Sequence, residues 1–235
     1  MARETGLRDR KKAQTRHRLA DVAARLFAEH GYDAVSVVDV ARAADVSDQT
    51  VYNYFTAKQD LVLDRADEIR ELYGRVVHER AASSSPATAL RQLVADDIAR
   101  YRQADPTIAR GEFPAQCLES PTLRRFALET RELQVLAITE AILTSSPELH
   151  PLSVKAHAAA LISVIQTITD LIGETMLANG PTDGAAAAMS RDADIAFDEL
   201  DRAFTSLVTA TAAAAAAAAA QTVTAPTDAA QAATT

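Results

Sequence analysis

One short stretch, DVSDQTVYNYF, places hydrogen-bonding side chains and two tyrosines within about three helical turns. Val51 and Phe55 are four residues apart on one helix face, so they are predicted to point into a core. The other faces then point outward, with Asp48, Gln49, Thr50, Tyr52, Asn53 and Tyr54. Gln and Asn can bind adenine through two hydrogen bonds, and hydroxyls can reach phosphates. The stretch is a candidate for reading DNA, and a solvated polar surface is the alternative.

Two short helices joined by a tight turn are predicted to position these side chains. Ser36 and Asp39 can cap the start of the first helix. Asp45 follows, one of the few residue types other than Gly that tolerate a positive φ. Ser47 can cap the second helix, expected over 48–54. A short, firmly held helix whose N-terminal residues are free is what entry into the major groove requires.

Longer helices are predicted around this pair. One spans about residues 9–30 and ends at Gly31, and another begins at a Thr56-x-x-Gln59 cap and runs to about residue 80. Further helices are expected over 87–103, 107–117, 122–144, 153–179 and 192–220. Ala is abundant, whereas the chain has only 7 Gly, 8 Pro and no Trp, which favours an all-α fold over a sheet.

The charge distribution separates a basic start from an acidic remainder. The formal net charge is −8, yet the first eighteen residues hold seven Arg and Lys against two acids. Such an arm can contact phosphates or the minor groove, and a disordered, solvated terminus is the alternative. The candidate contacts are Arg8, Arg10, Lys11, Lys12 and Arg16.

Patterns for other functions are weak. The five His are scattered and Cys117 is the single cysteine, so we expect no metal, no cofactor and no disulfide, and a cytoplasmic protein. The apolar stretch 157–178 is interrupted by Gln166, Asp170 and Glu174, which favours a buried helix over a membrane span. We expect no enzyme activity, although an all-helical enzyme or ligand carrier is the rival class.

The segment Leu19 to Val62 resembles the TetR/AcrR family of transcriptional regulators. The match rests on Leu-Phe-x-x-x-Gly-Tyr, Ser-Val-x-x-Val-Ala-x-x-Ala, Val-Ser-x-x-Thr-Val-Tyr-x-Tyr-Phe and Lys58-x-x-Leu61, in that order. The resemblance implies an all-α protein with an N-terminal three-helix helix-turn-helix DNA-binding domain and a C-terminal helical ligand-binding and dimerisation domain. We expect the first, with its basic arm, over 1–60, the second over 61–220, and a disordered low-complexity tail over 221–235.

The resemblance also implies roles for single residues. The expected contacts to double-stranded operator DNA are Ser36, Val37, Ser47, Asp48, Gln49, Thr50, Tyr52, Asn53, Tyr54 and Lys58, the last as a phosphate clamp. Two residues depart from the family pattern. Asp45 stands where the family usually has Gly, and Asp48 either stabilises the helix N-terminus or reads a cytosine amino group.

The C-terminal body is expected to bind a second copy and a small molecule. Apolar faces predict a two-fold homodimer through Leu161, Ile165, Ile168, Ile172, Leu200, Phe204 and Leu207, with a monomeric core as the alternative. Candidate effector contacts are Arg100, Tyr101, Phe113, Gln116, Cys117, Gln134, Gln166 and Asp170. The resemblance implies a repressor that a small, mostly apolar effector releases from a palindromic operator. The sequence does not name that effector.

Overall fold

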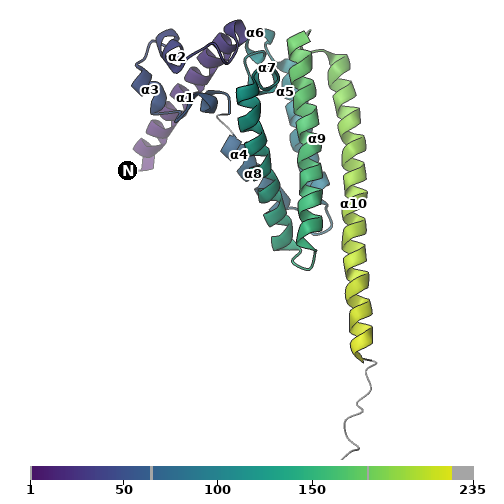
Figure 1. The fold of residues 1–235 in the computed structure, drawn as a ribbon. Helices are drawn as coiled ribbons and strands as arrows, with labels where there is room; N and C mark the ends of the chain where they lie inside the picture. The colour runs from purple at the N-terminus through teal and green to yellow at the C-terminus, as the bar shows by residue number, and fades with distance from the viewer. Residues whose placement is uncertain (1, 64–65, 179, 224–235) are drawn as a thin grey trace, which may run out of the picture.

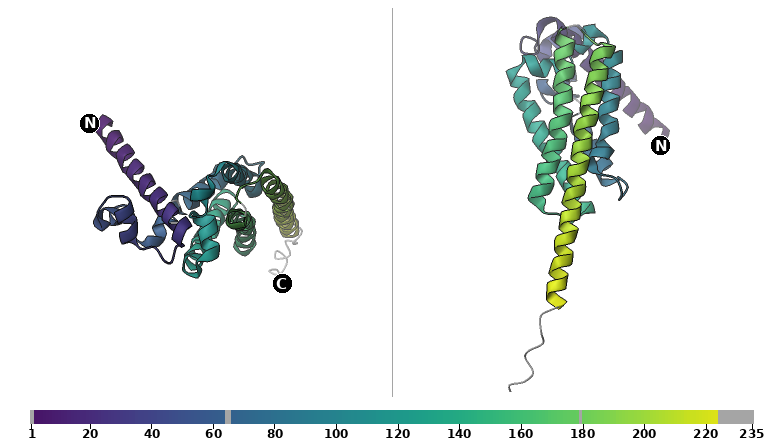
Figure 2. Two further views of the ribbon diagram at one scale, coloured as in Figure 1. Left: turned by 90° about the horizontal axis from the view of Figure 1, so that it is seen from above. Right: turned by 90° about the vertical axis from the view of Figure 1, so that its right-hand side faces the viewer.

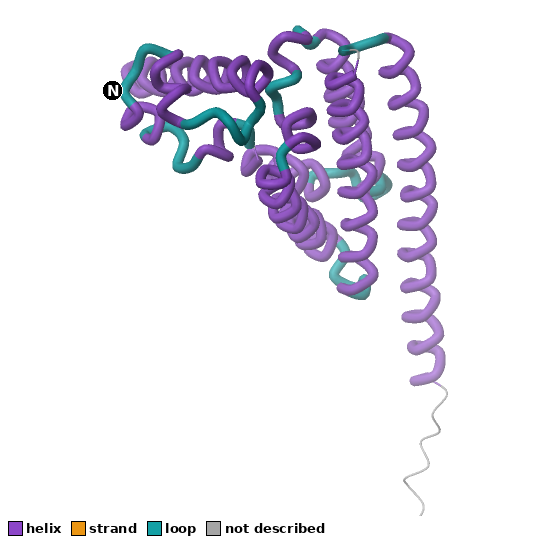
Figure 3. Tube along the Cα trace, turned by 45° about the horizontal axis from the view of Figure 1, so that its top comes forward, coloured by secondary structure: helices purple, strands orange, loops and turns teal. Residues whose placement is uncertain are grey.

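The computed structural model describes residues 2–63, 66–178 and 180–223, with side chains except at 2–9, 107 and 221–223. Within these ranges the chain is helical and contains no strand (Figure 3). The helices are α1 (Ala2–His30), α2 (Val37–Ala43), α3 (Asp48–Tyr52), the 3-10 helix η1 (Lys58–Leu61), α4 (Ala66–His78), α5 (Pro86–Gln103), α6 (Pro106–Ala109), α7 (Phe113–Glu119), α8 (Pro121–Ser145), α9 (Pro151–Ala178) and α10 (Asp183–Val223). The predicted all-α fold is confirmed.

The first three helices and η1 form a small head at one end of the molecule (Figure 1). Its core holds Leu19, Phe27, Val40, Val51 and Phe55, each at most 2% exposed. The same apolar cluster continues into Cys117, Leu123 and Ala127 of α7 and α8. The head is therefore seated on the body by a shared core rather than tethered by a linker.

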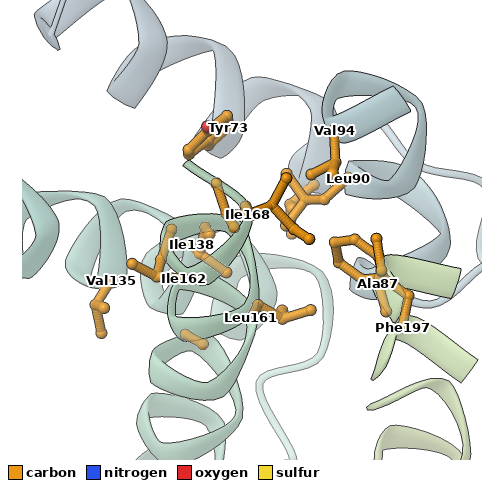
Figure 4. Packing of buried hydrophobic residues seen from close by; sticks show 14 of the residues in the cluster. Tyr73, Ala87, Leu90, Val94, Val135, Ile138, Leu161, Ile162, Ile168 and Phe197 are labelled. Carbon is orange, nitrogen blue, oxygen red and sulfur yellow. The ribbon is translucent and has the colours of Figure 1, made fainter. Parts of the chain in front are cut away.

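The body, α4 to α10, is a bundle of long helices. Helix α9 packs on α5, α7, α8 and α10, which matches its apolar sequence. Figure 4 shows Leu161, Ile162 and Ile168 of α9 within the core that Tyr73, Leu90, Ile138 and Phe197 bring from neighbouring helices. α9 and α10 are long and apolar enough to cross a membrane by length and composition. Burial in the bundle accounts for α9, and a run of Ala accounts for α10.

Two predicted turns are confirmed. Gly31, with φ of 80°, ends α1, and its N–H donates to the carbonyl of Phe27 over 2.8 Å. Tyr32 folds back so that its ring centroid lies 5.3 Å from that of Phe27. Asp45 adopts φ of 53° between α2 and α3, the left-handed conformation predicted for it. The turn at Gly31 sets the direction in which the chain leaves α1, and the turn at Asp45 sets the angle between α2 and α3.

Several predicted helix boundaries are wrong. The cap expected at Thr56 is absent: Ala57 N–H instead donates to Asp60 Oδ2 over 2.9 Å and opens η1, and the continuous helix begins only at Ala66. The helix expected over 107–117 is two helices, α6 and α7, because the chain turns sharply at Gly111. A Cβ at Gly111 would lie 1.6 Å from the Ala24 carbonyl oxygen, so only Gly allows this approach to α1.

The two ends of the chain also differ from expectation. The predicted basic arm is not a separate segment, since α1 already begins at Ala2. α10 begins nine residues earlier than predicted, at Asp183 rather than 192, and its backbone is helical through Val223, three residues into the predicted tail. The rest of that tail, 224–235, lies outside the described residues. Figures 1 and 2 show the end of α10 extending beyond the other helices.

The predicted dimer contacts need correction. Leu161, Ile165, Ile168, Ile172 and Phe204 are each at most 8% exposed and belong to the core of one chain. Leu200 and Leu207 are half-buried against the same core. The apolar periodicity was interpreted correctly as buried surface, but helices of the same chain cover it. The five buried residues pack inside one chain, and the homodimer stays a prediction that must use other residues.

Candidate nucleic-acid interface

Helix α3 presents a polar outer face on an apolar anchor. Val51 is fully buried and Phe55 is 2% exposed, so the predicted inward positions are confirmed. Ser47 caps the helix by accepting the Thr50 N–H over 3.1 Å, and its hydroxyl lies 2.8 Å from that of Thr50. Gln49 Nε2 donates to Asn53 Oδ1 over 3.3 Å. Ser47, Gln49 and Asn53 are exposed and Thr50 is half-buried, so a row of hydrogen-bonding groups faces outward.

The two tyrosines and Asp48 differ in setting. The Tyr52 side chain is exposed and that of Tyr54 is half-buried, so Tyr52 is the more accessible of the pair. Asp48 Oδ1 accepts the N–H of Gln49 over 2.9 Å at the first turn of α3. That contact favours the interpretation of Asp48 as a stabiliser of the helix N-terminus.

The start of α2 is held by a reciprocal cap. Ser36 Oγ accepts the Asp39 N–H over 3.1 Å, and Asp39 Oδ2 accepts the Ser36 N–H over 2.9 Å. The hydrogen bond from the Ser36 hydroxyl holds the pKa of Asp39 below its ordinary value. The side chain of Val37 is 8% exposed, so any DNA contact at this position must use its backbone N–H.

Lys58 lies against the head in a defined position. Its Nζ stands 4.1 Å from the centroid of the Tyr32 ring and 3.5 Å from the Asp33 carbonyl oxygen. Burial lowers the pKa of Lys58, and Asp33 partly offsets that effect. The ring and the carbonyl hold the ammonium group where a freely rotating lysine would be spread over many rotamers.

The basic residues of α1 separate into two groups. Arg10, Lys11 and Lys12 are exposed, as a phosphate contact requires, while the Arg8 side chain lies outside the described residues. Arg16 instead packs 4.3 Å from the Phe55 ring centroid and donates to the Tyr54 carbonyl. Arg16 was predicted as a DNA-contacting residue of the basic arm, whereas the structure places it against the residues that follow α3.

Half of the predicted effector contacts, which stay predictions, make contacts within the chain. The Tyr101 hydroxyl accepts the Thr182 N–H over 3.3 Å in a partly buried contact. Arg100 pairs with Asp97 on the surface, and Phe113 packs against the head. Gln116 joins the two parts of the molecule: Oε1 accepts the Tyr32 N–H over 2.8 Å, and Nε2 donates to the Arg110 carbonyl over 2.7 Å. Gln134 is half-buried on α8, outside the pocket described next.

Three of the predicted contacts do gather in one place. An open pocket of about 280 Å³ is lined by Cys117, Leu118, Pro121 and Arg124, close to the head. Asp170 accepts two hydrogen bonds from Arg124, 2.9 and 3.0 Å long, and one of 2.8 Å from Gln166. Sequence reasoning found Cys117, Gln166 and Asp170 but missed Arg124 and Arg131. Their spacing of seven on α8, which places them on one helix face, was the available signal.

Comparisons with known proteins agree on one family. Residues 19–64 match the model of the bacterial regulatory proteins of the tetR family. BetI, a helix-turn-helix transcriptional regulator of Burkholderia thailandensis, is 30% identical over 186 residues, covering 77% of this chain and 90% of BetI. The chain belongs to the tetR family. It is therefore a DNA-binding transcriptional regulator, and ligand-responsive repression is typical of this family.

Two further similarities are more limited. MftR of Mycobacterium tuberculosis, named for the regulation of mycofactocin biosynthesis, is 45% identical over 49 residues, which span 21% of this chain and only 25% of MftR. The crystal structure of NalD, the secondary repressor of the MexAB-OprM efflux pump in Pseudomonas aeruginosa, aligns with a TM-score of 0.52 at 19% identity. That alignment covers 81% of this chain and 97% of NalD and supports the fold.

Proposed function

We propose that this regulator binds a near-palindromic operator as a homodimer, with α3 in the major groove of each half-site. The single observation that supports this assignment is that residues 48–55, α3 and the turn after it, bury Val51 and Phe55 and face a polar row outward. Gln49 and Asn53 in that row are exposed, and Thr50 is half-buried. Buried anchors hold the helix rigidly, and the polar row supplies donors and acceptors for base edges.

Phosphate contacts would fix the register on either side of α3. The start of α2 presents Ser36 and the Val37 N–H, and the start of η1 presents Lys58. These groups are suited to contacting phosphates of one DNA strand. Tyr52, Tyr54 and Ser47 are assigned to the same backbone from α3. The exposed Arg10, Lys11 and Lys12, with Arg8, are assigned to flanking phosphates or the minor groove. In this proposal residues 1–60 form the DNA-binding domain and 61–220 the effector and dimerisation domain.

A second copy would dock on the outer faces of α9 and α10. Leu152 on α9 and Ile195 on α10 are 71% and 61% exposed, and Val208 is 38% exposed. These apolar groups remain after the inner faces of both helices are covered within one chain. A two-fold arrangement would place the α3 helices about one DNA turn, roughly 34–36 Å, apart. An effector bound in the body would favour a spacing of the two α3 helices that no longer fits the operator, so the dimer would release the DNA. We therefore propose that the protein is a repressor that acts in the cytoplasm.

Selection of bound fragments from genomic DNA, followed by anisotropy titrations at several salt concentrations, tests the proposal. We expect a fragment with two related half-sites to bind, and the logarithm of its binding constant to fall linearly with the logarithm of salt concentration. A protein that selects no fragment, or whose binding ignores salt, would not be the regulator proposed. An all-helical carrier or enzyme would select no fragment.

A further inference from the structure

The cluster beside the pocket contains more positive than negative charge. Arg124 and Arg131 both approach Asp170, at 2.9 and 3.7 Å from its Oδ1 atom. The side chains are 34%, 20% and 22% exposed, so water screens them only partly. Two guanidinium groups thus share one carboxylate. Partly buried charges of one sign call for a second counter-charge.

Arg131 has donors that Asp170 does not satisfy. Its Nε and Nη2 atoms are buried and have no hydrogen-bond partner within the part of the chain that the structure describes. These two atoms form one edge of the guanidinium, the edge that matches both oxygens of a carboxylate. Burial lowers the pKa of Arg131, while Asp170 raises it. A buried, charged edge without hydrogen bonds is costly even with Asp170 3.7 Å away, so its persistence calls for an explanation.

Arg124 provides the accessible charge. It lines the pocket together with Cys117, Leu118 and Pro121. Burial raises the pKa of the Cys117 thiol to about 12, so this wall is uncharged at neutral pH. A volume of about 280 Å³ lies at the small end of ligand pockets, which span roughly 300–1,000 Å³. The pocket therefore offers one cation at the rim of a small, uncharged surface.

We propose that the effector is a small amphipathic carboxylate that binds Arg124, while Asp170 passes from Arg124 to the edge of Arg131 that lacks hydrogen bonds. This proposal rests on the proposed function and names the ligand class of its effector site. The exchange gives each of the two carboxylates a guanidinium partner. Asp170 needs to move only about 1 Å, because its present distance of 3.7 Å from Arg131 exceeds a charged hydrogen bond of about 2.8 Å by that amount.

The position of the pocket connects this exchange to the head. Cys117 and Leu118 line the pocket from α7, and the same helix contributes Gln116, whose side chain accepts the Tyr32 N–H. Ser120, directly after α7, donates to Asp33 Oδ1 over 3.0 Å. Tyr32 and Asp33 are the residues that hold Lys58. A ligand that shifts α7 therefore acts on the support of a proposed phosphate contact.

Calorimetric titration with benzoate and hexanoate, each paired with its neutral amide, tests the ligand class. We expect the carboxylates to bind the wild-type protein and the amides to bind at least about 10-fold more weakly. Carboxylate binding should also release a selected operator fragment. Equal binding of amide and carboxylate, or no carboxylate binding at millimolar concentrations, would overturn the proposal.

Two variants should change carboxylate affinity in opposite directions, and a third is a control. Arg124→Gln should weaken carboxylate binding roughly 10- to 100-fold, because a charge-assisted pair is lost. Asp170→Asn should tighten it several-fold, because the competing carboxylate is gone. Arg125→Gln, an exposed arginine next in the chain, is the matched control and should change nothing. Wild-type affinity in Arg124→Gln, or weaker binding in a folded Asp170→Asn, contradicts the exchange.

Two measurements separate the possible failures. Circular dichroism checks that each variant is folded, and if Asp170→Asn is not, the Arg124→Gln and carboxylate-amide comparisons decide. Operator binding by the ligand-free wild type is measured in parallel. If the wild type retains no DNA fragment, the proposed function fails. If it retains DNA but ignores every carboxylate, only this inference fails.

Discussion

Lys58 differs from an ordinary surface lysine because the Tyr32 ring and the Asp33 carbonyl hold it in place. If it clamps a phosphate, Lys58→Ala should weaken binding to all DNA sequences alike. The slope of log binding constant against log salt should fall by about one. Anisotropy titrations between about 50 and 200 mM salt measure both. Lys155→Ala, in the body and paired with Glu132, is the control. An unchanged slope would remove Lys58 from the interface.

Thr50 is assigned a base contact rather than a phosphate contact. Thr50→Ala should cost about 1–3 kcal/mol on the selected operator and relax selectivity at one base position. The Ser47 cap should survive, because its hydroxyl accepts the Thr50 backbone N–H. Thr209→Ala, at an exposed position on α10, is the control. A uniform loss across all sequences would instead assign Thr50 to the DNA backbone.

His157 is a buried titratable group whose protonation opposes folding. Burial against the core lowers its pKa from the ordinary 6.5, although Asp201 raises it in part. Below pH 6.5 the unfolded chain binds more protons, so the free energy of unfolding falls as the pH falls. His157→Gln should flatten that dependence in denaturant titrations at pH 5 to 7. His150→Gln, at an exposed position, should leave the slope as in the wild type.

At the scale of elements, local hydrogen-bond patterns were the most predictable feature. Ser36 and Ser47 were predicted as caps and act as caps, because the cap depends only on residues within one turn. The cap predicted at Thr56 with Gln59 is wrong. Asp60, the residue after Gln59, accepts the N–H of Ala57, so the helical turn starts one residue later. Thr56-x-x-Gln59 fits the capping-box pattern better than Ala57-x-x-Asp60, because Ala57 has no hydroxyl, so the local pattern alone chose the wrong start.

The turn between α2 and α3 makes a prediction at the same scale. Asp45 is held at φ of 53°, where an L side chain is strained. Asp45→Gly should raise the free energy of unfolding by up to about 1 kcal/mol. Asp45→Val should lower it by about 1–2 kcal/mol or more, since a branched side chain fits this conformation worst. Urea denaturation measures both. Equal stability of the two variants would show that the turn relaxes to another conformation.

At the scale of the whole molecule, amphipathic periodicity showed which surfaces are buried but not what buries them. Ile165 and Ile168 were expected at a dimer interface and lie in the core of one chain. An apolar stripe is satisfied equally by a neighbouring helix of its own chain or of a partner. The Arg124–Asp170 pair joins residues 46 apart in the chain, so only the assembled bundle shows it. Long-range pairing of this kind carries no local sequence signal.

The joint between head and body supplies the last prediction. Gln116 is 1% exposed and satisfies both the Tyr32 N–H and the Arg110 carbonyl. Gln116→Leu keeps the volume but removes the partner of the buried Tyr32 N–H and of the Arg110 carbonyl, which should cost about 1–3 kcal/mol. Thermal unfolding measures that loss, and faster hydrogen exchange at the Tyr32 amide would locate it at the joint. Gln134→Leu, on the half-buried part of α8, is the control and should have a smaller effect. A stable Gln116→Leu protein with a protected Tyr32 amide would mean that the shared apolar core alone seats the head, and that α7 does not transmit ligand binding through this hydrogen bond.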